Sequence, residues 1–413
     1  MKYIKSIFIA LLLLFYFPIN ASAIEDPFIV PNNPFGIHIL DENDLEDAAE
    51  LVNSNGGDWG YVTLVIRKDE RDSNRWQKAF DKMRELHLIP IIRVATRQVN
   101  GGWEKPSVDE INGWISFFEE LNWVIKNRYI IIGNEPNHLT EWGGELDPEE
   151  YSDYLFDFSK RLKNTSPEYF IMSAGLDASA NNSSETMNEE DFLKRMILRN
   201  PSMFSYIDGW ASHSYPNPGF SGSEDSHGKG TVRTYDWEVS YLKSLGVKKD
   251  LPIFITETGW AHDMELSENG FINSDTVSKK IVQAFETAWK NEKIVAITPF
   301  LLNYQDEPFS KFSWKKKNGE FYEFYYHVRG LPKISGKPQQ TDKADILALV
   351  IPPLFYSDGG FKGITYIKNI GQIIWNDEYL IKTYIKNFPV EISPFKSEVS
   401  PGSKTFAIIK VMI

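Results

Sequence analysis

Two glutamates directly follow strongly apolar runs of the sequence. Glu135 follows the run 129–134, and Glu257 follows Ile253–Thr256. A charged side chain in such a place is costly unless it has a partner or a task. Two carboxyl groups can cleave a glycosidic bond when one protonates the leaving oxygen and the other attacks the anomeric carbon or activates water. That chemistry needs surroundings that keep one group protonated and the other ionised; the alternative is that each glutamate is an ion-pair partner.

Polar residues that could assist such a pair stand beside it or at the end of another apolar run. Asn134 directly precedes Glu135, although it could also cap the following turn. In the string Ser212-His213-Ser214-Tyr215-Pro216, His213 and Tyr215 are two residues apart and share one face of an extended chain. A satisfied core histidine is the alternative for His213, but the neighbouring tyrosine favours a functional role.

Aromatic and further polar candidates lie near the ends of the expected strands. Trp142 and Trp260 follow the two glutamate-bearing strands, where an indole can stack on a sugar ring or fill the core. His38, Asp177 and Asn303 also stand at or just past strand ends and are weaker candidates for the same pocket.

The elements that must position these residues alternate from about residue 34 onward. Short apolar runs predict eight strands, at Phe35–Leu40, Tyr61–Arg67, Ile89–Thr96, Tyr129–Asn134, Phe170–Ala174, Gly209–His213, Ile253–Thr256 and Ile294–Leu302. Amphipathic stretches predict eight helices, at Leu45–Asn53, Asn74–Leu86, Ser107–Leu121, Pro148–Leu162, Met187–Asn200, Val232–Leu245, Thr276–Asn291 and Tyr322–Leu331.

This alternation predicts an α/β fold, a (β/α)8 TIM barrel over residues 24–335, with function at the carboxyl ends of the strands. An open doubly wound sheet is the alternative, and the lack of a Gly-rich phosphate loop after the first strand disfavours it.

The pattern changes after about residue 333. Pro332, Gly336 and Pro338 mark a turn-rich link, and residues 344–413 lack long amphipathic stretches. Four strands are expected there, at Ile346–Leu354, Ile364–Ile370, Tyr379–Tyr384 and Thr405–Met412. We expect a small all-β C-terminal domain over residues 340–413, an incomplete sandwich or one that lends its sheet to the barrel.

The N-terminus has the pattern of a secretory signal peptide over residues 1–23. Lys2 and Lys5 precede an apolar run from Ile7 to Phe17, and Ala21-Ser22-Ala23 supplies small residues for cleavage. The run is short for a membrane span, although an uncleaved anchor is the alternative. We therefore expect a secreted or cell-surface protein whose mature chain has no membrane span.

Composition narrows the function classes. A net charge of −13 argues against a nucleic-acid partner. The sequence has no cysteine, so no disulfide is expected, and its 7 histidines lack the spacing of a zinc site. There is no Gly-x-Ser-x-Gly elbow, which disfavours an esterase. We expect no metal, no cofactor, a carbohydrate substrate and a monomer.

At this point the motifs resemble a family. Asn134-Glu135-Pro136 after the fourth expected strand and Glu257-Thr258-Gly259-Trp260 after the seventh are similar to glycoside hydrolase clan A. That clan includes cellulases, β-xylosidases and endo-β-1,4-galactanases. The likeness spans about residues 34–335, and no single family of the clan matches throughout. Lys368-Asn369-Ile370-Gly371 with Trp375 resembles a strand and turn of Ig-like domains.

The resemblance implies roles for individual residues. It makes Glu135 the acid/base and Glu257 the nucleophile of a retaining β-glycosidase. It implies that Asn134 binds the sugar 2-hydroxyl, that Tyr215 hydrogen-bonds the nucleophile and that His213 lines the sugar site. An arginine that pairs with the nucleophile is implied as well, and both Arg93 and Arg67 qualify.

One position departs from the clan. The clan often has a tryptophan at the end of the eighth strand, where this chain has Leu302-Asn303-Tyr304. The usual stacking contact in one subsite is therefore in doubt.

The sequence thus predicts a secreted retaining glycoside hydrolase that acts on β-linked poly- or oligosaccharide. Two alternatives remain: a non-catalytic carbohydrate-binding surface protein and a transglycosylase that remodels envelope polysaccharide. The sugar, the linkage and endo or exo action are left open.

Overall fold

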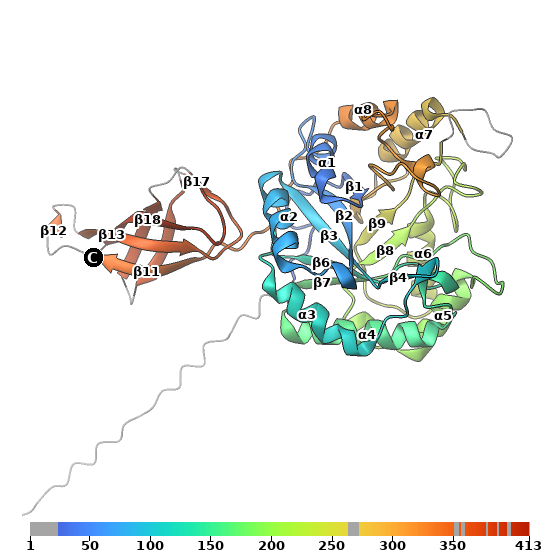
Figure 1. Ribbon diagram of the computed structural model, residues 1–413, viewed down its shortest axis with the longest axis horizontal. Helices are drawn as coiled ribbons and strands as arrows, with labels where there is room; N and C mark the ends of the chain where they lie inside the picture. The colour runs from blue at the N-terminus through green and yellow to red at the C-terminus, as the bar shows by residue number, and fades with distance from the viewer. Residues whose placement is uncertain are drawn as a thin grey trace, which may run out of the picture.

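The computed structural model describes residues 24–262, 272–350, 355–356, 360–376, 379–385, 388–394 and 398–412. The predicted signal peptide, residues 1–23, and the last four residues of the strand expected over Ile346–Leu354 lie outside these residues. A larger part of mixed helices and strands is followed by a smaller part of strands alone (Figure 1). The mixed α/β class is therefore confirmed.

The larger part contains eight parallel strands in two sheets. One sheet has the order β1-β2-β3-β6-β7 and the other β10-β9-β8. Isolated parallel bridges, Met172 with Gly209 and Phe35 with Ile297, join the two sheets at both edges, so the strands follow one another around a ring. The strands are β1 (Gly36–Ile39), β2 (Gly60–Arg67), β3 (Leu88–Ala95), β6 (Arg128–Ile132), β7 (Tyr169–Ser173), β8 (Trp210–His213), β9 (Ile253–Glu257) and β10 (Ile294–Ile297).

Helices alternate with these strands and lie around the outside of the ring (Figure 1). They are α1 (Leu45–Val52), α2 (Ser73–Glu85), α3 (Ile111–Glu120), α4 (Pro148–Thr165), α5 (Glu189–Arg199), α6 (Thr234–Ser244), α7 (Ser274–Glu286) and α8 (Glu323–Gly330). Short 3-10 turns are η1 (Glu42–Asp44), η2 (Lys68–Glu70), η3 (Val108–Glu110), η4 (Leu139–Glu141), η5 (Met203–Ser205) and η6 (Ser310–Phe312). A hairpin of β4 (Gln98–Val99) and β5 (Gly102–Trp103) follows β3.

Local sequence explains both element types. The strand β3 reads Leu-Ile-Pro-Ile-Ile-Arg-Val-Ala, and seven of its eight residues are buried, as expected for a strand covered on both faces. Pro90 precedes the ladder between β3 and β6, which begins at Ile91. Helix α2 begins after Asp72, whose carboxylate accepts hydrogen bonds from the amides of Asn74 and Arg75. Trp76, among other apolar residues of α2, turns to the core.

Several predicted boundaries differ from the structure, and the helix expected over Thr276–Asn291 ends at Glu286. The strand expected over Ile294–Leu302 stops at Ile297, because Pro299 has no N–H for the ladder. The helix expected from Ser107 begins with the turn η3, and α3 starts only at Ile111. Ser107 does cap that turn, but Glu110 pairs with Arg71 at 3.0 Å and does not reach back to complete a capping box.

The C-terminal part is antiparallel. A sheet of order β11-β13-β18-β16-β15 carries β12 at its edge, and β14 pairs separately with β17. The strands are β11 (Ala344–Val350), β12 (Phe355–Tyr356), β13 (Gly360–Asn369), β14 (Trp375–Asn376), β15 (Ile381–Ile385), β16 (Phe388–Pro394), β17 (Glu398–Val399) and β18 (Lys404–Met412). The sequence missed β16 because Pro389 and Pro394 resemble strand breakers. The Ig-like topology stays a prediction.

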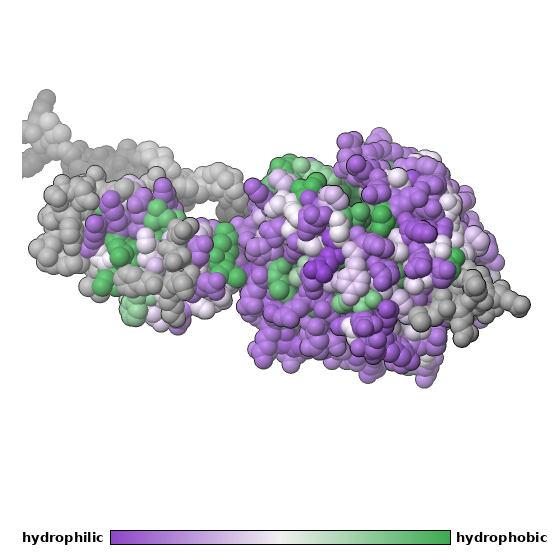
Figure 2. All heavy atoms as spheres, turned by 90° about the horizontal axis from the view of Figure 1, so that it is seen from above, coloured by the Kyte–Doolittle hydropathy of each residue, from purple (hydrophilic) through white to green (hydrophobic). Residues whose placement is uncertain are grey.

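This sheet has its own small core, and its described strands do not pair with the ring. Trp375, Ile392 and Ile409 are fully buried in it. Its opposite face leaves Ile364, Phe406 and Ile408 exposed, and Figure 2 shows apolar patches on this part, whereas polar residues dominate the larger one. The expectation that the sheet is lent to the barrel is therefore wrong for the described strands.

The two parts meet at the loop before β6. Gln372 Nε2 donates to the Ile125 carbonyl at 2.8 Å, and Asn122 Nδ2 donates to the Gly371 carbonyl at 2.9 Å. Because this loop leads into the amino end of β6, the C-terminal sheet lies away from the carboxyl ends of the strands. Among the described residues, no helix has the length and apolarity to cross a bilayer.

Candidate active site

Glu135 lies just past the carboxyl end of β6 on a strained backbone. Gly133 and Glu135 have positive φ angles of 92° and 31°. A non-glycine residue in this region is uncommon and persists where the surrounding structure holds it. The amide of Glu135 donates to the Gly175 carbonyl at 3.0 Å, and the buried Asn137 side chain donates to the carbonyls of Asp177 and Met187. These contacts aim the Glu135 carboxylate toward the centre of the ring.

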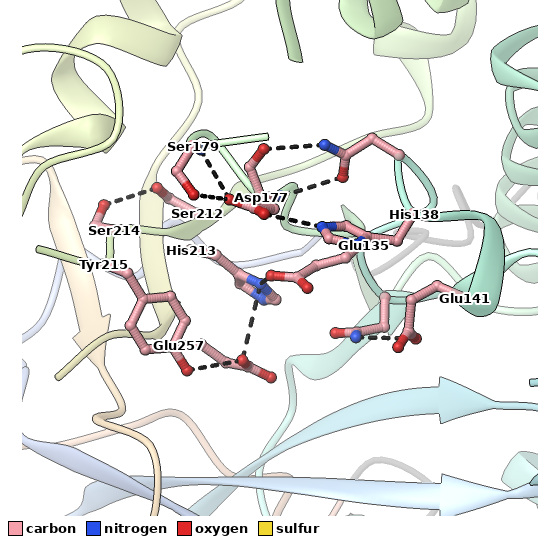
Figure 3. Close-up of polar contacts among 12 residues, drawn as sticks. Glu135, His138, Glu141, Asp177, Ser179, Ser212, His213, Ser214, Tyr215 and Glu257 are labelled. Atoms are coloured by element: carbon pink, nitrogen blue, oxygen red, sulfur yellow. Dashed lines mark hydrogen bonds and ion pairs between the residues drawn. The ribbon is translucent and has the colours of Figure 1, made fainter. Parts of the chain in front are cut away.

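Glu257 is the last residue of β9 and faces Glu135 across the mouth of the ring. Arg93 Nη1, from β3, donates to Glu257 Oε1 at 3.0 Å. The Tyr215 hydroxyl donates to Glu257 Oε2 at 3.1 Å (Figure 3). The Glu257 side chain is 10 % exposed and that of Glu135 is 22 % exposed. The Glu257 carboxylate is thus buried beside a positively charged arginine, whereas the Glu135 carboxylate is more accessible from solvent.

His213 lies between the two carboxylates. Its Nδ1 is 2.7 Å from Glu135 Oε1 and 3.9 Å from Glu257 Oε2 (Figure 3). An oxygen of Glu135, a ring nitrogen of His213 and an oxygen of Glu257 all lie within 4.8 Å of one another. The fold therefore brings His213 to Glu135, which lies 78 positions earlier in the chain, and Tyr215 to Glu257, which lies 42 positions later.

The electrostatics around Glu257 favour its ionised form. Burial raises the pKa of Glu257, but the charges of His213 and Arg93 outweigh it and hold the pKa below its usual value. Burial lowers the pKa of His213, but the charges of Glu257 and Glu135 raise it by more, so the pKa lies above its usual value. Burial, with the charge of Glu257, keeps the pKa of Tyr215 well above its usual value, so its hydroxyl remains a donor. Glu257 is therefore ionised at neutral pH.

The structure decides between the two arginines. Arg93 contacts Glu257, and its Nη1 also donates to Asn134 Oδ1. Arg67 instead forms an ion pair with Glu70 at 2.8 Å, and its side chain is 35 % exposed. Arg93 and Asn134 thus belong to the site, and Arg67 does not.

The interpretation of Trp142 and Trp260 as stacking platforms is wrong. Each residue is 2 % exposed and therefore offers no open ring face. Trp142 packs against Tyr151 and donates to Glu150 Oε2, and Trp260 donates to the Gly222 carbonyl. Both indoles are core residues whose N–H groups have partners, as buried tryptophans require.

Of the three weaker candidates, His38, Asp177 and Asn303, the structure places only His38 beside Glu257. His38 is fully buried and its Nε2 lies 3.9 Å from Glu257 Oε1, so it is part of the site. Asp177 accepts from His138 Nε2 at 2.9 Å and supports the loop after β7. Asn303 donates to Asp44 Oδ1 at 3.1 Å and so contacts the loop before α1.

Four further residues lie near the site although no sequence motif or periodic pattern indicates them. Phe300 packs edge-on to His38 at 5.2 Å between ring centres, near where a tryptophan was expected. Glu141 accepts from Asn134 Nδ2 at 3.1 Å, and His138 pairs with Asp177. A methyl group built on Gly175 would lie 2.2 Å from His213 Cδ2. Such contacts depend on which loops meet, and neither periodicity nor a motif reveals them.

Among the described residues, one cluster has the geometry to hold a metal ion, and it is Glu135, His213 and Glu257 itself. Each of its members already contacts another charged or polar side chain of the site. The expectation of a metal-free and cofactor-free enzyme stays a prediction.

Replacing Gly175 by alanine should lower kcat/KM for the reaction of Glu135 and Glu257 roughly 100-fold. That is the scale of a lost general acid–base contact. The new methyl group would overlap His213 Cδ2 and Nε2, at 2.2 and 2.6 Å, and push the ring off Glu135. Gly330→Ala is the matched control, because nothing lies within 4 Å of its added carbon. Activity of Gly175→Ala within twofold of the control, at equal Tm, would contradict this role for the His213 contact.

His38 should make folding sensitive to acid. Burial lowers its pKa to about 3, so the unfolded chain binds its proton more readily between pH 6.5 and 3. Stability from this residue is therefore present above pH 6.5 and is lost as pH falls. From pH 7 to pH 5 wild type should lose about 2 kcal/mol more unfolding free energy than His38→Asn. Urea titrations at both pH values measure this, and equal losses would refute it.

Comparisons with known proteins add the following. No family model matches the sequence, and no curated protein matches it. Among solved structures, the chain is similar to an endo-β-1,3-glucanase from Sorangium cellulosum, with 13 % identity and a TM-score of 0.47 over 72 % of this chain and 98 % of that one. It is also similar to a monomeric β-xylosidase from Caulobacter crescentus, with 11 % identity and a TM-score of 0.49 over 91 % and 75 %.

A third similar structure is an α-L-arabinofuranosidase from Thermotoga maritima, with 12 % identity and a TM-score of 0.45 over 95 % of this chain and 98 % of that one. All three TM-scores lie below 0.5. These likenesses assign no activity to this chain.

Proposed function

We propose that this chain is a secreted retaining glycoside hydrolase that cleaves β-glycosidic bonds of a poly- or oligosaccharide. One observation carries the proposal: oxygens of Glu135 and Glu257 lie within 4.8 Å of one another in unequal surroundings. Carboxyl groups about 5 to 5.5 Å apart suit double displacement, whereas inversion needs about 6.5 to 9.5 Å to admit a water. We take the ring of strands to be a (β/α)8 barrel that presents both groups at its mouth.

In the proposed reaction, a Glu257 oxygen attacks the anomeric carbon while Glu135 gives its proton to the leaving oxygen. The glycosidic bond breaks and a glycosyl ester of Glu257 forms. Glu135, now a carboxylate, takes a proton from water, and the hydroxide displaces Glu257. Arg93 and Tyr215 keep the nucleophile ionised and oriented, and His213 orients Glu135 through the 2.7 Å contact.

Other parts of the proposal rest on the sequence. The β configuration rests on the likeness of Asn134-Glu135-Pro136 and Glu257–Trp260 to clan A. Secretion rests on the pattern of Lys2, Lys5, the apolar run 7–17 and Ala21-Ser22-Ala23.

The test is a screen of the purified chain on a broad set of polysaccharides, with Glu257→Gln as the negative control. The first product from an active substrate is then followed by proton NMR, before mutarotation. Retention of the anomeric configuration is expected, and inversion would overturn the mechanism. Binding of a glycan without any turnover would favour the non-catalytic alternative, and transfer to added acceptor sugars would favour a transglycosylase.

A further inference from the structure

A third carboxyl group, that of Glu141, lies beside the site and has no task in the two-glutamate mechanism. It ends η4, six residues after Glu135, and its Oε2 accepts from Asn134 Nδ2 at 3.1 Å (Figure 3). Asn134 Oδ1 accepts from Arg93 Nη1, and the same Nη1 donates to Glu257 Oε1 at 3.0 Å. A continuous chain of hydrogen bonds therefore links Glu141 to the nucleophile.

The two hydrogen-bond partners of Asn134, Glu141 and Arg93, determine the orientation of its side-chain amide. A carboxylate only accepts hydrogen bonds, so Glu141 must face the NH2 group of Asn134. A guanidinium only donates, so Arg93 must face the amide oxygen. Turning the amide over would place acceptor against acceptor and donor against donor. Glu141 and Arg93 together allow one orientation.

We propose that Glu141 is a positioning residue, whose carboxylate locks the Asn134 amide and, through Asn134 and Arg93, holds Glu257 in its attacking position. This inference rests on the proposed function, because the position matters only if Glu257 is the nucleophile. It assigns to the loop η4 a part in catalysis that neither motif contains.

The surroundings of Glu141 make the lock sensitive to pH. Burial, then the charge of Glu135, raises the pKa of Glu141 to about 7, against the opposing charge of Arg93. Glu257 raises the pKa further, and His138 of the same loop, whose pKa is raised by its hydrogen bond to Asp177, also interacts with the charge of Glu141. Above pH 7 the group is a carboxylate that accepts from Asn134. Below pH 7 it becomes a carboxylic acid, a weaker acceptor, so the lock weakens as pH falls.

The first arm of the test needs no substrate. The side-chain amide signals of Asn134, identified by their loss in Asn134→Ser, are followed by 15N–1H NMR from pH 5 to 9. In wild type they should shift with a midpoint near 7, and in Glu141→Gln that step should vanish. Signals that do not shift near pH 7 in wild type, or that shift identically in both, would overturn the proposal. Because no turnover is measured, this result is independent of whether any glycan is cleaved.

The second arm measures kinetics on the polysaccharide that wild type cleaves. Glu141→Ala should lower kcat 10- to 100-fold at pH 8, since small misplacements of reacting groups cost about 100-fold. Glu141→Gln, whose Oε1 accepts from Asn134, should stay within about threefold of wild type and lose the pH step near 7.

The matched control is Glu145→Ala, four residues further on, where the side chain is 57 % exposed and pairs with Lys105. It should leave kcat and its pH profile unchanged. If Glu141→Ala behaved like Glu145→Ala, or only lowered Tm, Glu141 would be a structural residue. If Glu141→Gln fell as far as Glu141→Ala, charge rather than hydrogen-bond acceptance would matter, and the proposal would be wrong.

Discussion

Replacing Glu257 by glutamine should lower kcat at least about 10⁴-fold, the scale seen when an enzyme loses its nucleophile. The amide is nearly the same size as the carboxylate but is a very weak nucleophile, so the glycosyl ester does not form. The loss corresponds to about 5 kcal/mol of barrier. Initial rates on the substrate found by screening measure the effect. A mechanism-based 2-fluoro glycoside should add its sugar mass to Glu257 in wild type and leave the variant unlabelled.

The loss must be separated from unfolding, because the variant removes the partner of Arg93. That guanidinium is buried, and an uncompensated buried charge is destabilising. Thermal unfolding of the variant therefore accompanies the kinetics. Glu320→Gln, a glutamate whose side chain is 67 % exposed, is the control for loss of one carboxylate. Wild-type turnover by folded Glu257→Gln would refute the assignment of the nucleophile.

Replacing Glu135 by alanine should lower kcat/KM roughly 10³-fold on natural glycosides, because their poor leaving groups need a proton. Aryl glycosides with acidic phenols need little protonation and should lose far less in the first step. The second step then becomes slow, since no base activates water. Added azide, which needs no base, should accelerate turnover and yield a glycosyl azide of retained configuration.

This pattern distinguishes the acid/base from a residue that only stabilises the fold. An equal loss on natural and activated substrates, with no effect of azide, would contradict the role of Glu135. The variant His213→Gln changes the residue that contacts Glu135. Its loss of activity should also be larger on natural than on activated glycosides, but smaller than that of Glu135→Ala. It removes the ring nitrogen 2.7 Å from Glu135 but leaves the carboxyl group in place.

Much of the fold can be predicted from the sequence because the patterns that indicate strands and helices are local. The apolar runs of β2 and β3 and the amphipathic pattern of α2 each lie within a dozen or so residues. Errors arose where a nearby proline altered the backbone: β10 ends before Pro299, and β16 contains Pro389 and Pro394. The burial of Trp142 and Trp260 escapes the sequence for another reason: position along the chain places a side chain near a strand end but does not say how deeply it is covered.

Local sequence is enough to place Glu135 and Glu257 at the carboxyl ends of two strands, because each follows an apolar run. The groups that surround them depend on tertiary contacts. It selected Arg93 over Arg67, placed His213 against Glu135 and brought Glu141 to Asn134. Arg93 and Glu257 are 164 residues apart, and their contact depends on strand register and on how the ring closes. Those are properties of the whole chain, which no local pattern encodes.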